Sequence, residues 1–526
     1  MTTMRNTDLL DSVARHRTNL LSLARRFTRG DVRFADIRVE AMDGRSASAE
    51  NGMPKVAGSK RHLSVGIRVL AGSSGARSPG YWGAILGPGE TARIEKRAAE
   101  GLAVAAERAR HNAKAKAASR GRFKELGAAL VSTELAATEV HRDTVPARYK
   151  IDPAQVSEAQ AASVAAEATK LALAADKKVV YAYLDLLTFR NRRLYLSSEG
   201  ADIDQSFAVT QASAAAVARG KDGVQIIGDA IGHQRGWEMI EEGVTDDPLM
   251  PIPTLESFVK NLAREAAELS DCPQCPGSGG KEAVIVTDPH YNTLLVHEII
   301  GHPSELDRAL KMETGYAGRS WFLQDAKRSQ LGKPIASGKV SAFSDATLPG
   351  LGHYRYDDEG TKARRVWIVK DGVLNELMSG RQTAAALGLR SNGSYFVTSG
   401  AMVGIIRMNN TVFAGGGDDP GRLISEVDRG YYLVGHKTPS IAESRENFRI
   451  TARKVYEITN GRLGRLYRNG GMMASSKSYL MSVDGVGRDF RMITISSCGK
   501  GLPMQLKRMA NGGPTMRGRG ILTGAD

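Results

Sequence analysis

The chain has 526 residues, of which 42% are apolar and 25% charged, the balance of an ordinary globular protein with roughly two to four domains. Its net charge of +15 would suit nucleic acid, a membrane surface or an acidic protein as partner. The basic clusters are short and scattered, so we interpret them as solvated surface and expect no nucleic-acid partner. There is no apolar run of about eighteen residues and no signal-peptide pattern, and the three cysteines are too few for a disulfide framework. We therefore expect a cytoplasmic protein without a membrane anchor.

The first half of the sequence mixes strand and helix patterns. Alternating apolar and polar residues predict strands over 34–41 and 63–70, and helical periodicity predicts a helix over 91–118. Asp152 and Pro153 have the residue types that begin a helix, which would run to Ala175. Three more strands are expected at 179–187, 194–197 and 207–210, and a helix capped by Thr254 is expected at 254–269. We predict a mixed α/β region over residues 1–275.

A breaker-rich segment at residues 271–280 predicts a boundary between two regions. A strand over 283–287 follows it, and Asp288 with Pro289 then begins a helix. Further on, helices are few, at 381–386 and 421–427, and short β-prone runs dominate, at 365–369, 394–398, 403–407, 448–455 and 492–496. We expect an α+β fold in which residues 276–526 form a mainly β, barrel-like C-terminal domain that carries the helix after Asp288.

That helix contains the most informative motif of the chain, the segment from His297-Glu298 to Gly301-His302. Histidine is a common metal ligand, and a glutamate beside a ligand can take a proton from an attacking water. The familiar zinc helix separates its two histidines by four residues, whereas here they are five apart, about 140° around a regular helix. Both can bind one metal only if a π-bulge accommodates the extra residue, which Gly301 would ease. The alternative is two unrelated histidines on different helix faces.

A catalytic zinc site usually has three protein ligands and a water. Near the motif, Glu305 and Asp307 are candidates for the third ligand. Farther along the chain, Cys498 follows a predicted strand and is expected in a glycine-bearing turn, where a thiolate can face a metal. The alternative for Cys498 is a small buried apolar side chain.

Together these segments resemble the TldD/PmbA family of metalloproteases, from about Phe34 to the end of the chain. The metal-binding, TldD-type subunit has H-E-x-x-x-H followed by a Glu and an Asp, which Glu305 and Asp307 match, and a Cys-Gly-Lys segment, which residues 498–500 match. Other segments similar to the family are residues 357–360, 370–374, 407–411 and 513–524. The sequence departs from the family pattern at 501–505 and at 435–437.

The resemblance implies a zinc metallopeptidase in which His297, His302 and Cys498 bind the metal and Glu298 is the general base. It also implies short or unfolded peptides as substrates and a closed chamber formed with a related, metal-free subunit, hence a hetero-oligomer. Residues expected to support the ligands or bind substrate are Glu305, Asp307, Arg407 and Asn410. The alternative is a non-catalytic basic binding or modulator protein with a structural metal site. Glu298 favours the enzyme, because a structural site has no use for an adjacent base.

Several other groups allow more than one interpretation. Cys272 and Cys275 form a CxxC, which we interpret as part of a surface loop, with metal or redox roles as alternatives. The carboxylates of residues 357–359 could bind a second cation, but a solvated turn is the simpler hypothesis. His290 is expected to cap its helix or face solvent. Arg407 and Asn410 could contact a substrate backbone or tie down an irregular β segment.

Overall fold

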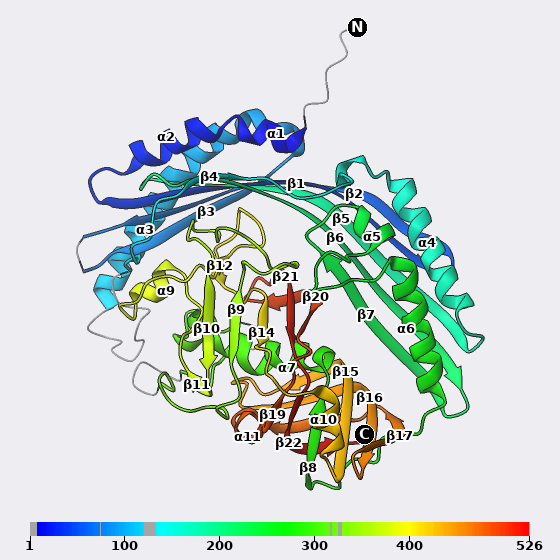
Figure 1. Cartoon of the computed structure of the whole chain (residues 1–526). Helices are drawn as coiled ribbons and strands as arrows, with labels where there is room; N and C mark the ends of the chain where they lie inside the picture. The colour runs from blue at the N-terminus through cyan, green and yellow to red at the C-terminus, as the bar shows by residue number, and fades with distance from the viewer. Residues whose placement is uncertain (1–7, 74, 120–132, 316–317, 324–328, 525–526) are drawn as a thin grey trace.

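The computed structural model of the protein describes residues 8–73, 75–119, 133–315, 318–323 and 329–524. A large curved sheet from the first half arches over the C-terminal elements, which lie under its concave face (Figure 1). The mixed α/β composition confirms the predicted fold class. Among the described helices, none combines the length and hydrophobicity needed to cross a lipid bilayer.

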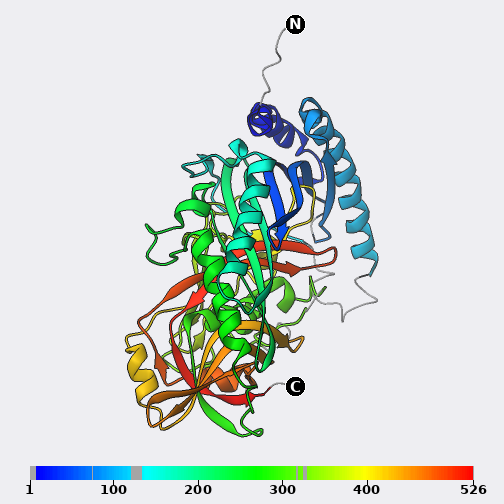
Figure 2. The ribbon, with the colours of Figure 1, turned by 90° about the vertical axis from the view of Figure 1, so that its right-hand side faces the viewer.

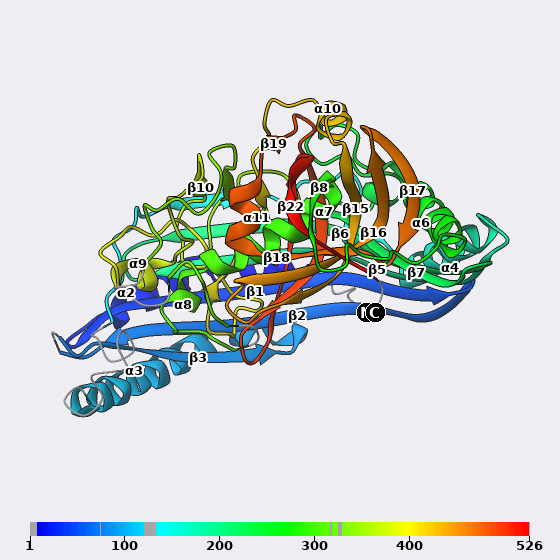
Figure 3. The ribbon, with the colours of Figure 1, turned by 90° about the horizontal axis from the view of Figure 1, so that it is seen from below.

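The curved sheet is built on four strands of 19 residues each, which are antiparallel to their neighbours in the order β2-β1-β5-β6. Seen from below, β1 and β2 run along the molecule with α3 on one side and the C-terminal elements on the other (Figure 3). β3 pairs with β2, and both β4 and β7 pair with β6. The bounds are β1 (Val32–Glu50), β2 (Met53–Ala71), β3 (Ser78–Leu86), β4 (Arg142–Val145), β5 (Val179–Ser197), β6 (Asp202–Gly220) and β7 (Gly223–His233).

The prediction of two separate strands at 179–187 and 194–197 is wrong, because β5 is continuous through the arginines between them. Each arginine has an acidic partner that removes the cost of placing its charge in the sheet. Arg190 bonds Asp8, while Arg192 pairs with Asp204 of β6 at 2.7 Å. Sequence periodicity could not reveal these partners, because they come from distant segments.

Helices cover the convex face of this sheet (Figure 1). They are α1 (Leu9–Ala14), α2 (Arg17–Phe27), α3 (Ile94–Ser119), α4 (Glu158–Ala174) and α6 (Leu255–Ser270). The Thr254 cap is confirmed, since its side chain accepts from the Ser257 amide. The predicted start at Asp152 is wrong for α4: Asp152 caps a single 3-10 turn, Val156 is extended, and Ser157 caps the helix. Buried alanines of α4 and of β6 lie in the same core cluster, and their small side chains let helix and sheet approach closely.

Two large sheets make up most of the described C-terminal half. One has the strand order β11-β10-β9-β14-β21-β20. In the other, β15, β8, β22, β18 and β16 pair in turn, and a β15–β16 ladder closes this sheet into a ring. The predicted barrel-like form of residues 276–526 thus corresponds to a ring in one sheet, while the first sheet is open. This ring lies at the end of the molecule opposite α1 and α2 (Figure 2). The bounds are β8 (Glu282–Thr287), β9 (Ala342–Asp345), β10 (Arg365–Lys370), β11 (Val373–Leu374), β14 (Thr411–Phe413), β15 (Arg429–Ile441), β16 (Asn447–Thr459), β17 (Arg462–Arg468), β18 (Gly471–Ser475), β19 (Gly485–Val486), β20 (Arg491–Lys500), β21 (Gln505–Gly513) and β22 (Met516–Thr523).

The expected strands at 394–398 and 403–407 shrink to two residues each, β12 (Tyr395–Phe396) and β13 (Ile405–Ile406). Short helices do occur near the expected places, as α9 (Arg381–Ala385) and α10 (Pro420–Ser425). The helix α7 (Pro289–Val296) packs between the two C-terminal sheets, against β15 and β21. The motif at the end of α7 is therefore surrounded by both sheets.

The acidic group at residues 357–359 is not a solvated turn. Asp357 accepts hydrogen bonds from the amides of Thr361 and Tyr395, and Asp358 bonds Arg193 of β5 at 3.1 Å. Glu359 is buried 3.5 Å from Arg68 of β2. This group thus joins the C-terminal half to the curved sheet, which is why its charges are buried.

The prediction that Cys272 and Cys275 lie in a surface loop is only partly right. Cys275 is buried in the C-terminal core and Cys272 is partly buried, and both are free thiols. Burial raises the pKa of both thiols, so they are protonated at neutral pH.

Gly66 of β2 lies at the contact between the two halves, and its close packing leads to a prediction about stability. A Cβ there would lie 1.7 Å from the Gly400 carbonyl oxygen, whereas a Cβ at Gly58 on the same strand would meet no atom within 4 Å. We expect Gly66→Ala to lower the free energy of unfolding by about 1–3 kcal/mol, the usual cost of overpacking. Urea titrations of both variants measure this effect, and equal midpoints for Gly66→Ala, Gly58→Ala and the unchanged chain would contradict it.

Candidate metal centre

The end of α7 has the distortion that the histidine spacing predicts. The α-helix ends at Val296 and continues as a π-helical turn over His297–Gly301, in which the amide of His302 donates to the carbonyl of His297. A 3-10 turn follows at His302–Ser304. Gly301 packs closely against Met408, since a Cβ there would lie 2.7 Å from the sulfur of that side chain. The π turn rotates the two imidazoles toward one side, and the predicted bulge is confirmed.

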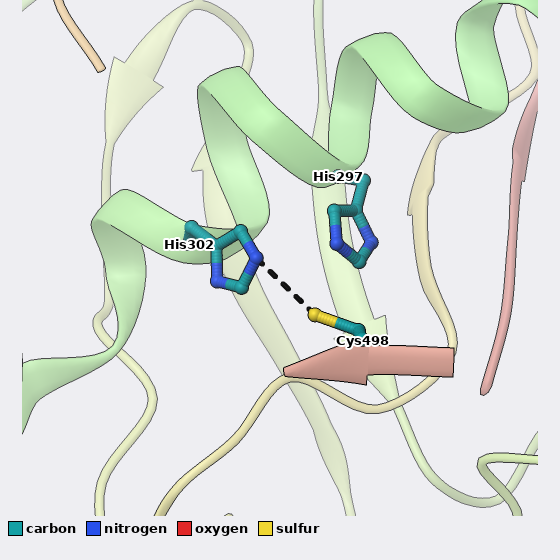
Figure 4. A group of neighbouring side chains, drawn as sticks. All are labelled: His297, His302 and Cys498. Carbon is teal, nitrogen blue, oxygen red and sulfur yellow. Dashed lines mark hydrogen bonds between the residues drawn. The ribbon is translucent and has the colours of Figure 1, made fainter. Parts of the chain in front are cut away.

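The three candidate ligands converge (Figure 4). The ring centroids of His297 and His302 are 4.7 Å apart, and Sγ of Cys498 lies 3.3 Å from Nε2 of His302. One donor atom from each of the three residues lies within 4.8 Å of the other two. All three side chains are buried.

Cys498 lies in strand β20, so the predicted turn is misplaced. β20 pairs with β21 through Lys500, and the turn comes only after it. Lys500 is the last residue of β20, and its buried ammonium bonds Asp307 Oδ1 at 2.5 Å and the Ile406 carbonyl at 2.7 Å. The ladder shifts register between Ile495 and Cys498, a bulge of the kind that redirects a side chain.

Each histidine is held through its Nδ1 atom. Nδ1 of His302 lies 3.1 Å from Glu305 Oε2, which leaves Nε2 facing the thiol. The side-chain amide of Asn511 lies 2.8 Å from Nδ1 of His297. Burial lowers the pKa of both histidines, so their rings are neutral at pH 7. Burial alone would raise the pKa of the Cys498 thiol, but His302 and Arg407 more than offset it and lower that pKa. Neutral imidazoles and a thiolate are the forms that bind metals.

The four other residues singled out by sequence all lie inside the protein. Glu305 bonds Arg308 at 2.7 Å, and Asp307 accepts from the Ile406 amide at 2.9 Å. Arg407 donates to the carbonyls of Cys498 and Gln505, each at 2.8 Å. Asn410 bonds backbone groups of residues 348, 349, 352 and 510. These contacts favour the hypothesis that Arg407 and Asn410 tie down an irregular β segment over the hypothesis that they contact a substrate backbone.

A cavity of about 610 Å³ opens onto the three candidate ligands and Glu298. Glu298 Oε2 lies 3.6 Å from Nε of Arg445, which also lines the cavity. Arg445 has a left-handed backbone (φ 65°), uncommon for a side chain of this size and typical of functional sites. The curved sheet supplies part of the wall through Ser213, Gly228, Asp229 and Ala230.

Sequence reasoning missed Arg445, Asn511, Asp229 and His436, all of which contact or line this site. They lie in other segments, and the only sequence signal was the unusual pattern at 435–437. The expectation for His290 is also wrong. Its Nε2 lies 3.1 Å from Asp229 Oδ2, and its ring lies beside that of His436, with the centroids 4.7 Å apart.

The chain is similar in sequence and in fold to known proteins. Models of PmbA/TldA metallopeptidases match residues 35–113 (domain 1), 151–270 (central domain) and 280–523 (C-terminal domain). A metalloprotease of Methanothermobacter thermautotrophicus is 29% identical over 346 residues, which is 66% of this chain and 70% of that protein. A zinc metalloprotease TldD homolog of Saccharolobus solfataricus is 26% identical over 339 residues, which is 63% and 68% of the two chains.

Two crystal structures have a similar fold at 16% sequence identity. One, from Thermotoga maritima, has a TM-score of 0.69 and covers 97% of this chain and 100% of that one. Its name refers to modulation of a DNA gyrase. The other, TldE from Thermococcus kodakarensis, has a TM-score of 0.66 over 97% and 99% of the two chains. At this identity the likeness shows the fold alone.

Asp229, in the wall of the cavity, leads to a prediction about how the stability of the protein depends on pH. Burial opposes ionisation there, but Arg453 and His290 outweigh it and hold the pKa of Asp229 well below its usual value. Such a carboxylate stabilises the fold above its unfolded-state pKa of about 3.9 and loses that contribution as the pH falls further. Asp229→Asn should therefore have a lower free energy of unfolding than the unchanged chain at pH 7. This difference in free energy should become smaller as the pH falls from about 5 to 3.

Urea unfolding at stepped pH measures the difference. The control is Asp246→Asn, which removes an exposed pair with Arg235 and should change stability little. A gap for Asp229→Asn that stays constant with pH would contradict the prediction.

Proposed function

This chain belongs to the PmbA/TldA metallopeptidase family, and we propose that it is a zinc-dependent peptidase that hydrolyses short or unfolded peptides. The observation that carries the proposal is the convergence of His297, His302 and Cys498 on one cavity, with Glu298 beside them. The relative from Saccharolobus solfataricus is named as a zinc enzyme, which supports the choice of metal.

The residues present fit zinc. Two imidazole nitrogens and a thiolate are a typical zinc donor set, and tetrahedral zinc with bonds of about 2.0–2.3 Å needs donor atoms roughly 3–4 Å apart. The 3.3 Å between Cys498 Sγ and His302 Nε2 meets this need, and the donor atoms of all three residues lie within 4.8 Å of one another. Glu305 contacts Nδ1 of His302, the ring nitrogen that faces away from Cys498. A carboxylate at this nitrogen commonly supports a metal-bound histidine. Within the part of the chain that the structure describes, no fourth His, Cys, Asp or Glu joins the group, as an open catalytic site requires.

Bound zinc would supply a Lewis acid for the scissile carbonyl and acidify the attacking water. Glu298 takes the proton from that water as its oxygen bonds to the carbonyl carbon. The same carboxyl then delivers the proton to the leaving nitrogen as the C–N bond breaks. Arg445, 3.6 Å away, attracts the Glu298 carboxylate and holds it toward the cavity.

The cavity suits a mobile peptide. Its volume of about 610 Å³ lies in the range that holds a ligand of a few residues, but a folded domain could not enter it. We propose that a related, metal-free subunit closes this cavity into a chamber. The rival function is a non-catalytic modulator, to which the name of the Thermotoga maritima protein refers. Glu298 beside the ligands favours the peptidase.

The first prediction of this proposal concerns metal content. The purified chain should hold about one zinc, and Cys498→Ser should retain much less after dialysis, because a hydroxyl is a poor replacement for a thiolate. Cys272→Ser is the matched control, since this thiol lies outside the ligand group. Metal analysis by mass spectrometry decides the question: equal zinc in the two variants would remove Cys498 from the ligand set.

The second prediction separates catalysis from binding. Glu298→Gln keeps the side-chain volume and the ligands, so zinc should stay bound while peptide turnover falls by about 10²–10⁴-fold, the usual contribution of a general base. Turnover of an unstructured peptide is measured with the related subunit present and with zinc content matched. Glu443→Gln, a change at an exposed position, is the control.

Equal turnover by Glu298→Gln and the unchanged protein would exclude Glu298 from the mechanism. If the unchanged, zinc-loaded protein cleaves no unstructured peptide at all, the modulator function is favoured instead.

A further inference from the structure

A second cavity, of about 150 Å³ and partly open to solvent, lies between the concave face of the curved sheet and the β20–β21 hairpin. It is separate from the metal cavity: β20 lines the metal cavity through residues 494–499, while β21 lines this one through residues 506–508. The wall that faces β21 includes Phe189, Asn191 and Phe207 of the curved sheet, together with Tyr354 and Phe396.

Two adjacent cations of β21, Lys507 and Arg508, lack a carboxylate partner among the described residues. Lys507 is only 5% exposed, and its ammonium bonds the side-chain oxygen of Asn409 at 2.5 Å. Nε of Arg508 bonds Gln211 Oε1 at 3.1 Å. Burying a charge without an opposite charge is costly. Burial, reinforced by Arg407, accordingly lowers the pKa of Lys507 to about 7.

The carboxylates of the same wall are already engaged. Arg193 bonds both Glu40, at 3.2 Å, and Asp358, at 3.1 Å. Asp357 accepts from backbone amides, and its pKa is raised well above the usual value by burial and by the neighbouring Glu359. Among the described residues, Lys507 and Arg508 therefore remain outside these ion pairs.

Aromatic rings form the rest of the lining. The Lys507 ammonium lies 4.9 Å from the ring centre of Phe396 and 5.2 Å from that of Tyr354. The Arg508 guanidinium lies 5.6 Å from the ring centre of Phe189. Oδ1 of Asn191, a side chain that is 5% exposed, has no hydrogen-bond partner among the described residues. The cavity thus offers cationic side chains and apolar ring surface to a ligand.

We propose that this cavity binds a small organic anion, a carboxylate on a compact apolar body. The carboxylate lies between Lys507 and Arg508 and supplies the missing negative charge, while the body packs against Phe189, Phe207 and Phe396. The volume is below the roughly 300–1,000 Å³ of sites for drug-sized ligands, so the ligand is small. This site requires no metal and goes beyond the proposed peptidase activity.

Benzoate is a suitable probe, with benzamide as its uncharged isostere and inorganic phosphate as an anion without an apolar body. Calorimetric titration of the full chain should detect benzoate but neither of the other two. Arg508→Gln should weaken benzoate binding by about 10–100-fold, the loss expected for one charge-assisted bond of about 1.5–3 kcal/mol. Arg491→Gln, an exposed arginine of the paired strand β20, is the matched control and should bind benzoate as the unchanged chain does.

Carboxylates also bind zinc, so the titration is repeated with His302→Ala after chelation. Retained binding there, together with loss in Arg508→Gln, supports the proposed site. Binding that disappears in His302→Ala but persists in Arg508→Gln would assign benzoate to the metal cavity and overturn the inference. The inference is also overturned if benzamide or phosphate binds as tightly as benzoate. It is overturned too if benzoate does not bind at millimolar concentration. Lys507→Met is a second variant, and its fold is checked by circular dichroism before titration.

Discussion

The candidate site depends on one buried carboxylate, that of Glu305. It contacts Nδ1 of His302, bonds Arg308 and lies 3.3 Å from the ammonium of Lys500. Burial would raise its pKa, but the charges of Lys500, His302 and Arg308 more than offset this and hold that pKa well below its usual value. Removing one partner of a buried ion pair typically costs about 3–5 kcal/mol, because the other charge is then uncompensated. Glu305 therefore joins the turn after α7 to strand β20 and sets the position of both His302 and Cys498.

Around this carboxylate, two departures from regular backbone face the same cavity. The π turn brings His297 and His302 to one side, and Arg445 has a left-handed conformation beside Glu298. Such conformations persist where the surrounding packing outweighs their cost, and they are concentrated at functional sites. Here the surroundings are Met408 against Gly301 and Ser476, whose hydroxyl donates to the Arg445 carbonyl at 2.6 Å.

The long strands of the curved sheet serve both cavities. One part of β6 and β7 forms a wall of the metal cavity, and another part of β5 and β6 forms a wall of the cavity at Lys507 and Arg508. Between the two stands the β20–β21 hairpin, in which Cys498 and Lys507 are partners in the ladder. Cys498 of this hairpin lines the metal cavity, and Lys507 lines the other.

The sequence by itself determined the features that depend on neighbouring residues. The caps at Thr254 and Asp288 and the π turn required by a five-residue histidine spacing all follow from contacts within a few positions. The family resemblance likewise rests on short ordered motifs. Only the tertiary structure decided the continuity of β5, the strand position of Cys498, and the approach of Arg445 to Glu298 and of Asn511 to His297. In each case the deciding partner lies on another element of the fold, and burial of opposite charges or the register of two strands brings it into contact, which the pattern within one element does not record.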